Sequence, residues 1–174
     1  MTDETSEREK GLTEHIMILG IGNLLFSDEG FGIHVVKNLK ENYSFPPNVS
    51  VLDGGVLGLN LLGYISEADY LIVIDAVRNG GQPGSLYRLE GEAIPARFRA
   101  KNSLHQVDFL EALTLCQALD KVPEAVILGV EPGDIETLSV ELTSATVGKI
   151  DAIIVMVLKE LDRLGATYNR RSGS

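Results

Sequence analysis

Short apolar runs alternate along this chain with segments of helical spacing, and this alternation constrains the fold more than any other feature. The apolar runs, which are rich in Ile, Val and Leu, lie at residues 15–19, 49–52, 70–74 and 125–130. Continuous runs of this kind are typical of strands that are buried on both faces of a parallel sheet. The intervening segments 31–39, 57–65 and 109–116 have the spacing of amphipathic helices.

The remaining segments predict the edge of the sheet and a closing helix. Residues 85–89 follow a turn rich in glycine and proline and predict an edge strand, whose direction the sequence leaves open. Residues 144–164 predict one long helix with Ser144 as its N-cap. Its apolar stripe consists of Val147, Ile150, Ile154, Val157, Leu158 and Leu161. The fold class is therefore α/β, a three-layer α/β/α sandwich around a mostly parallel, twisted sheet.

A length of 174 residues suits one domain, and nothing inside the apolar pattern resembles a linker. We expect a single domain over residues 15–166. The polar segment 1–14 is expected to be a mobile N-terminal tail, and residues 167–174 a flexible C-terminal tail.

Charge and cysteine content exclude several classes of function. The formal net charge of -10, from 25 acidic and 15 basic residues, would repel nucleic acid and anionic lipid. The longest apolar run, 152–158, is far shorter than the roughly 20 residues of a membrane-spanning helix. Cys116 is the only cysteine, so no intrachain disulfide or cysteine-based zinc cluster can form. Without a signal peptide in residues 1–14, the chain is expected to be cytoplasmic.

The loop 20–32 follows the first predicted strand and leads into a helix. Its opening glycines resemble a dinucleotide-binding fingerprint, but Leu25 stands where the third glycine is needed. Asp28 and Glu29 also have the wrong charge for a phosphate at a helix N-terminus. These acids suit a cation better, and for Asp28 we favour a role as a helix-capping residue.

Other polar residues follow the later strands or open a helix. Asp53 and Asp75 end strands, and His105 lies in a predicted first helical turn. Each could serve only a turn or the solvated surface. In a parallel sheet, however, ligands bind beyond the carboxyl ends of the strands. Glu29, Asp75 and His105 together are two carboxylates and an imidazole, which suit Ni²⁺, Zn²⁺ or Fe²⁺ and leave coordination positions open.

Five motifs in this order and spacing resemble the hydrogenase maturation endopeptidases, and the resemblance extends from about residue 16 to residue 164. The motifs are Leu-Gly-Ile-Gly-Asn-Leu-Leu at 19–25 with Asp-Glu-Gly-Phe-Gly at 28–32, Leu-Asp-Gly-Gly at 52–55, Ile-Asp-Ala at 74–76, His-Gln at 105–106 and Gly-Val-Glu-Pro at 129–132. One departure is Val56, where many members have threonine.

This resemblance implies a protease that removes a short C-terminal peptide from the precursor of the large subunit of a nickel-iron hydrogenase. It implies that Glu29, Asp75 and His105 contact nickel, and that Asp53 is a further functional acid. The nickel would be carried by the substrate, with no tightly bound cofactor of the enzyme's own. We assign Asp53 and Asp75 as candidate catalytic residues and expect a monomer that binds neither nucleic acid nor membrane.

Two alternatives remain open. A non-catalytic nickel sensor or metallochaperone would use the same three ligands and would bind nickel tightly by itself. A nucleotide-binding α/β protein would be stabilised by nucleotides in thermal melts. A serine hydrolase is disfavoured because no Gly-x-Ser-x-Gly motif is present.

Overall fold

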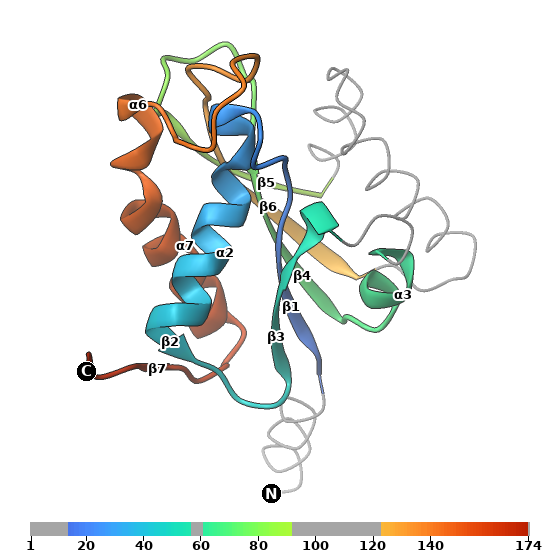
Figure 1. The fold of residues 1–174 in the computed structure, drawn as a ribbon. Helices are drawn as coiled ribbons and strands as arrows, with labels where there is room; N and C mark the ends of the chain where they lie inside the picture. The colour runs from blue at the N-terminus through green and yellow to red at the C-terminus, as the bar shows by residue number, and fades with distance from the viewer. Residues whose placement is uncertain (1–13, 57–60, 92–122, 174) are drawn as a thin grey trace, which may run out of the picture.

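A five-stranded sheet forms the middle layer of the computed structural model, which describes residues 14–56, 61–91 and 123–173 (Figure 1). The strand order is β3-β1-β4-β6-β5. The strands are β1 (Ile16–Gly20), β3 (Val49–Asp53), β4 (Tyr70–Ala76), β5 (Leu86–Glu90) and β6 (Glu124–Val130). Strands β3, β1, β4 and β6 pair in parallel, and β5 is an antiparallel edge strand. The predicted mostly parallel sheet is confirmed, and the direction of the edge strand is now assigned.

Helices cover both faces of this sheet. Helices α2 (Phe31–Asn42) and α7 (Ile150–Arg163) lie together on one face, and α3 (Leu61–Ser66) lies on the other (Figure 1). The alternate residues Ile16 and Ile18 of β1 belong to the core beneath α2 and α7, whereas Met17 and Leu19 belong to the core with α3. The continuous apolar runs are explained by this burial on both faces. The α/β/α architecture is thus confirmed, although the predicted helix at 109–116 lies outside the described residues.

The closing helix is interrupted, contrary to the prediction of one helix over 144–164. The structure has α6 (Ser144–Val147) and α7, separated by a turn at Gly148 and Lys149. The N-cap of α6 is Thr143, in an extended conformation, rather than Ser144. Val147 of α6 is exposed, although the prediction placed it on the buried stripe.

Part of the expected C-terminal tail is paired. Strand β7 (Asn169–Arg170) pairs antiparallel with β2 (Tyr43–Ser44). The Arg171 side chain also donates a hydrogen bond of 2.9 Å to the carbonyl of Tyr43. Residues 169–171, within the predicted flexible tail 167–174, are therefore attached to the segment that follows α2.

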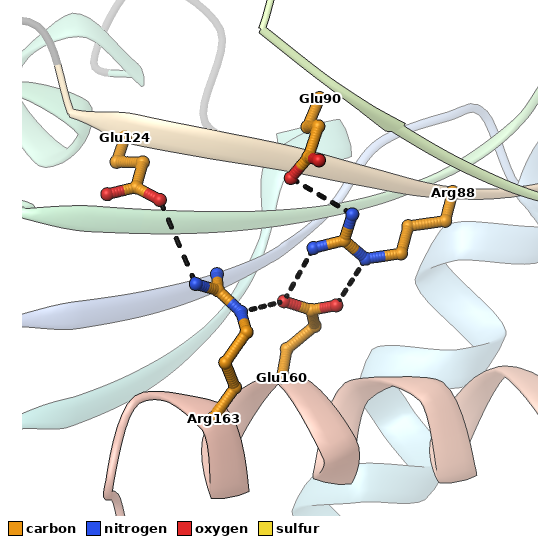
Figure 2. Close-up of polar contacts among 5 residues, drawn as sticks. All are labelled: Arg88, Glu90, Glu124, Glu160 and Arg163. Atoms are coloured by element: carbon orange, nitrogen blue, oxygen red, sulfur yellow. Dashed lines mark hydrogen bonds and ion pairs between the residues drawn. The ribbon is translucent and has the colours of Figure 1, made fainter.

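A buried carboxylate joins α7 to the edge of the sheet (Figure 2). Glu160 accepts two hydrogen bonds from the Arg88 guanidinium, at 2.6 and 3.2 Å, and one of 3.1 Å from Arg163. Arg88 also pairs with the exposed Glu90, and Arg163 lies 3.9 Å from the exposed Glu124. A carboxylate on the inner side of α7 is thereby neutralised by two cations.

We expect Glu160→Gln to lower the free energy of unfolding by about 2 kcal/mol at neutral pH. The hydrogen bonds from Arg88 lower the pKa of Glu160, burial raises it, and Arg163 lowers it further, with a net decrease from the ordinary value of 4.5. A carboxyl with a depressed folded pKa stabilises the protein above its unfolded pKa, and this contribution is lost as the pH falls through the folded pKa. Urea unfolding at pH 7 and at acid pH should therefore give a smaller difference between variant and wild type in acid.

Glu124→Gln provides the matched control, because Glu124 is exposed and its distance from Arg163 is long. It should change the free energy of unfolding little at either pH. An equal loss for Glu160→Gln at both pH values would contradict a contribution from the ionised carboxylate.

Candidate active site

The predicted acidic residues gather at the carboxyl edge of the sheet. Asp53 ends β3 and Asp75 lies near the end of β4, on either side of β1. Glu29 lies in the short 3-10 helix η1 (Ser27–Gly30), between β1 and α2. The register places Gly20 of β1 opposite both Asp53 and Ile74, so β1 and β3 end at the same level and β4 extends two residues further, to Ala76. Because the helices after β1 and β3 lie on opposite faces, this edge has the topology of a ligand-binding crevice.

Backbone contacts hold the loop that carries Glu29. Gly22 has φ +141°, and a Cβ atom there would clash with the Glu29 carbonyl oxygen. The same carbonyl accepts a hydrogen bond of 3.2 Å from the Asn23 amide. A Cβ atom at Gly32 would likewise clash with the carbonyl of Ile74, the residue before Asp75. Glycines therefore permit the β1–α2 connection to pack directly against the end of β4.

The three acids differ in their surroundings. Asp75 is buried, whereas Glu29 and Asp53 are half-buried. The Asp53 carboxylate accepts a hydrogen bond of 2.9 Å from the Gly55 amide, which closes the turn after β3. The expected turn-forming role of Asp53 is thus observed, and its second carboxylate oxygen makes no hydrogen bond to any described residue that would compete with a substrate.

The predicted metal ligands are only partly within the described residues. Glu29 and Asp75 lie at the same edge, but His105 lies outside the described residues. Among residues 14–56, 61–91 and 123–173, no group of three or more His, Cys, Asp or Glu side chains is arranged to hold a metal ion. The described ligands are carboxylates, which suit a divalent cation only if further donors complete the site.

Asp28 makes many polar contacts with other described residues at this edge. Its side chain is fully buried, and both carboxylate oxygens accept hydrogen bonds from one distant segment. The donors are the amides of Gly133, Asp134 and Thr143 at 2.7, 3.1 and 2.8 Å, and the hydroxyls of Thr143 and Thr146 at 2.8 and 2.6 Å. Burial raises the pKa of Asp28, but the hydrogen bonds from Thr146 and Thr143 outweigh it and leave the pKa below its ordinary value.

The prediction that Asp28 caps the following helix is wrong. Neither η1 nor α2 has a side-chain hydrogen bond at its N-cap. The carboxylate instead joins the Glu29 loop to the segment between β6 and α7. The sequence contained no local signal for this contact, because its donors lie 105 to 118 residues away.

Glu131, in the predicted Gly-Val-Glu-Pro motif, fixes the neighbouring connection between β4 and β5. Its buried carboxylate accepts hydrogen bonds of 2.7 Å from the Asn79 amide and 2.8 Å from the Tyr87 hydroxyl. Burial, together with the neighbouring Glu131, raises the pKa of Tyr87. The loop 77–85 is therefore attached to the end of β6, next to Asp75.

Comparison with known proteins shows that this chain is similar to proteins of one family. The sequence profile described as hydrogenase maturation protease matches residues 33–160. The hydrogenase expression/formation protein HupD of Bradyrhizobium diazoefficiens is 40% identical over 159 residues, covering 90% of this chain and 83% of its own length.

Solved structures agree with the sequence comparison. The hydrogenase maturating endopeptidase HybD from Escherichia coli has a TM-score of 0.86 at 33% identity, covering 92% of this chain and 99% of its own. The [NiFe] hydrogenase maturation protease HybD from Thermococcus kodakarensis has a TM-score of 0.67 at 26% identity, covering 84% and 98%. Both similarities extend over more than four-fifths of this chain.

Proposed function

The chain belongs to the hydrogenase maturation protease family, and on this premise we propose that it removes a short C-terminal peptide from the nickel-loaded precursor of a hydrogenase large subunit. The observation that carries the proposal is the position of Glu29, Asp53 and Asp75, which all lie at the carboxyl edge of the sheet. The similar protein from Thermococcus kodakarensis is described as a [NiFe] hydrogenase maturation protease, which supports nickel as the metal.

In this proposal nickel is part of the substrate. Glu29 and Asp75, with His105, supply two carboxylates and an imidazole, and ligands from the precursor complete the coordination. Because these three ligands do not complete the coordination of the metal by themselves, they bind the free ion weakly. Cleavage then depends on correct loading of the precursor with nickel.

In this proposal Asp53 acts on the attacking water or on the peptide. It ends the strand next to β1, and its turn leaves one carboxylate oxygen outside the hydrogen bond to Gly55. A half-buried carboxylate can accept a proton from an attacking water. A metal near the scissile carbonyl supplies Lewis-acid stabilisation when it is present.

The decisive experiment mixes the purified protein with a hydrogenase large-subunit precursor in nickel-loaded and nickel-free forms. The intact mass of the precursor reports loss of a C-terminal peptide. We expect loss only from the loaded precursor, and none with Glu29→Gln or His105→Ala. Cleavage that is independent of nickel would retain the protease but remove the proposed role of Glu29, Asp75 and His105.

A metallochaperone with the same ligands predicts a different outcome. It would bind free nickel tightly without a partner and would cleave no precursor. Isothermal titration with nickel therefore accompanies the cleavage assay. Tight binding of the free ion together with an intact precursor would overturn the proposed protease function.

A further inference from the structure

Exposed apolar side chains gather beside the acidic edge of the sheet. Leu24 and Leu25, in the loop that carries Glu29, are 39% and 55% exposed. Leu138 and Val140, between β6 and α6, are 75% and 60% exposed. We call these four residues the apolar patch. Clustered exposed apolar residues of this kind mark interaction sites more often than single ones do.

Backbone pairing makes the two halves of the apolar patch continuous. Phe26 and Ser139 form a parallel bridge, so the preceding residues Leu25 and Leu138 are neighbours. The Ser139 amide donates to the Leu25 carbonyl at 2.9 Å, and the Ser27 amide donates to the Ser139 carbonyl at 2.7 Å. This bridge places the Glu29 loop beside the segment between β6 and α6, so the apolar patch extends over both segments.

The segment on which Leu138 and Val140 lie is held in place from both ends. Asp28 binds the amides of Gly133 and Thr143, before and after it. Ser27 donates from its hydroxyl to the Glu141 carbonyl at 3.0 Å. The side chains are exposed although their backbone is fixed, which reduces the entropy lost when a partner binds.

The rim of the apolar patch is acidic. Asp134, Glu136 and Glu141 flank Leu138 and Val140, and no lysine or arginine occurs in residues 133–148. The side chains of Glu136 and Glu141 are exposed. A partner segment with apolar residues and flanking positive charges would match both features.

We propose that the apolar patch docks an apolar segment of the precursor that is flanked by lysine or arginine. This inference rests on the proposed function, because it assigns the patch to the substrate of that site. Leu24 and Leu25 share a loop with Glu29, so a segment seated on the patch enters the acidic edge directly. The apolar patch thereby selects the precursor, while the acidic edge cleaves it.

The test compares a double substitution in the apolar patch with a single substitution of an exposed valine elsewhere. Val140→Ser, combined with Leu138→Ser, removes half of the patch. Val155→Ser is the matched control, because Val155 is 50% exposed on the outer side of α7. Binding of the nickel-loaded precursor is measured by interferometry, and cleavage is measured alongside it. We expect the double variant to raise both Kd and KM about tenfold, with little change in kcat or thermal midpoint. The lost contacts stabilise the bound precursor and the transition state equally, so their removal weakens binding without slowing the chemical step.

A second pair of substitutions tests the acidic rim. Glu136→Gln with Glu141→Gln should weaken binding at low ionic strength and reduce its salt dependence. Unchanged Kd in the Leu138→Ser, Val140→Ser protein would overturn the proposal, as would an equal effect of Val155→Ser. A shift from dimer to monomer in sedimentation would assign the patch to a second copy of the chain and would also overturn it. Patch-dependent binding without any cleavage would refute the protease function alone.

Discussion

Asp75→Asn is expected to slow cleavage of the nickel-loaded precursor by at least about 100-fold, the scale of removing a positioned acid–base or charged group from a site. Asparagine has nearly the same shape as aspartate, so the buried end of β4 can be retained while the negative charge is lost. Single-turnover cleavage, followed by the intact mass of the precursor, measures this effect directly.

Asp69→Asn is the control for this variant. Asp69 immediately precedes the other end of β4 and accepts a hydrogen bond of 2.7 Å from the His15 amide, which an asparagine oxygen can also accept. It should leave the rate unchanged. If Asp75→Asn cleaved as fast as wild type at an equal thermal midpoint, the assignment of Asp75 to the site would be wrong.

Asp28→Asn is expected to lower the free energy of unfolding by about 3 kcal/mol, the effect of disrupting a buried, charged hydrogen-bond network. The five donors around Asp28 require two acceptor oxygens. Asparagine supplies one acceptor and directs an NH₂ group at the remaining donors. Urea unfolding at neutral pH gives the change in free energy.

Asp134→Asn distinguishes this effect from a general loss of acidic charge. One oxygen of Asp134 accepts hydrogen bonds from the amides of Glu136 and Thr137, a turn-forming role that asparagine performs as well. This variant should unfold within about 0.5 kcal/mol of wild type. Equal effects of the two substitutions would contradict the central role of Asp28 in joining the loops.

The strands and the layer order were predictable because they depend on local composition. Runs of Ile, Val and Leu place strand ends within two residues of those observed, since a strand buried on both faces requires apolar residues at every position. The approximate position of Asp53 and Asp75 followed from the same runs. The interruption at Gly148 was not predictable, because the apolar spacing continues through it into α7.

Long-range polar contacts could not be predicted from the sequence. Glu160 follows the buried Val157 by three residues on the inner side of α7, and its buried charge is explained by Arg88, 72 residues earlier, together with Arg163. Asp28 has the position of a helix cap, yet its donors all lie beyond residue 132. A sequence pattern reports the periodicity of one segment, and such pairs depend on how two segments meet.

The close packing of glycines in the β1–α2 connection also limits which substitutions the sequence can accept there. Gly22 and Gly32 have no room for a methyl group, so neither position can accept a gradual series of larger residues. The exposed positions 136, 138 and 140 can vary freely without moving the backbone. A library built to redirect the enzyme to another hydrogenase should therefore randomise those outer positions and retain both glycines, because new substrate preferences can evolve there while the geometry around Glu29 is inherited intact.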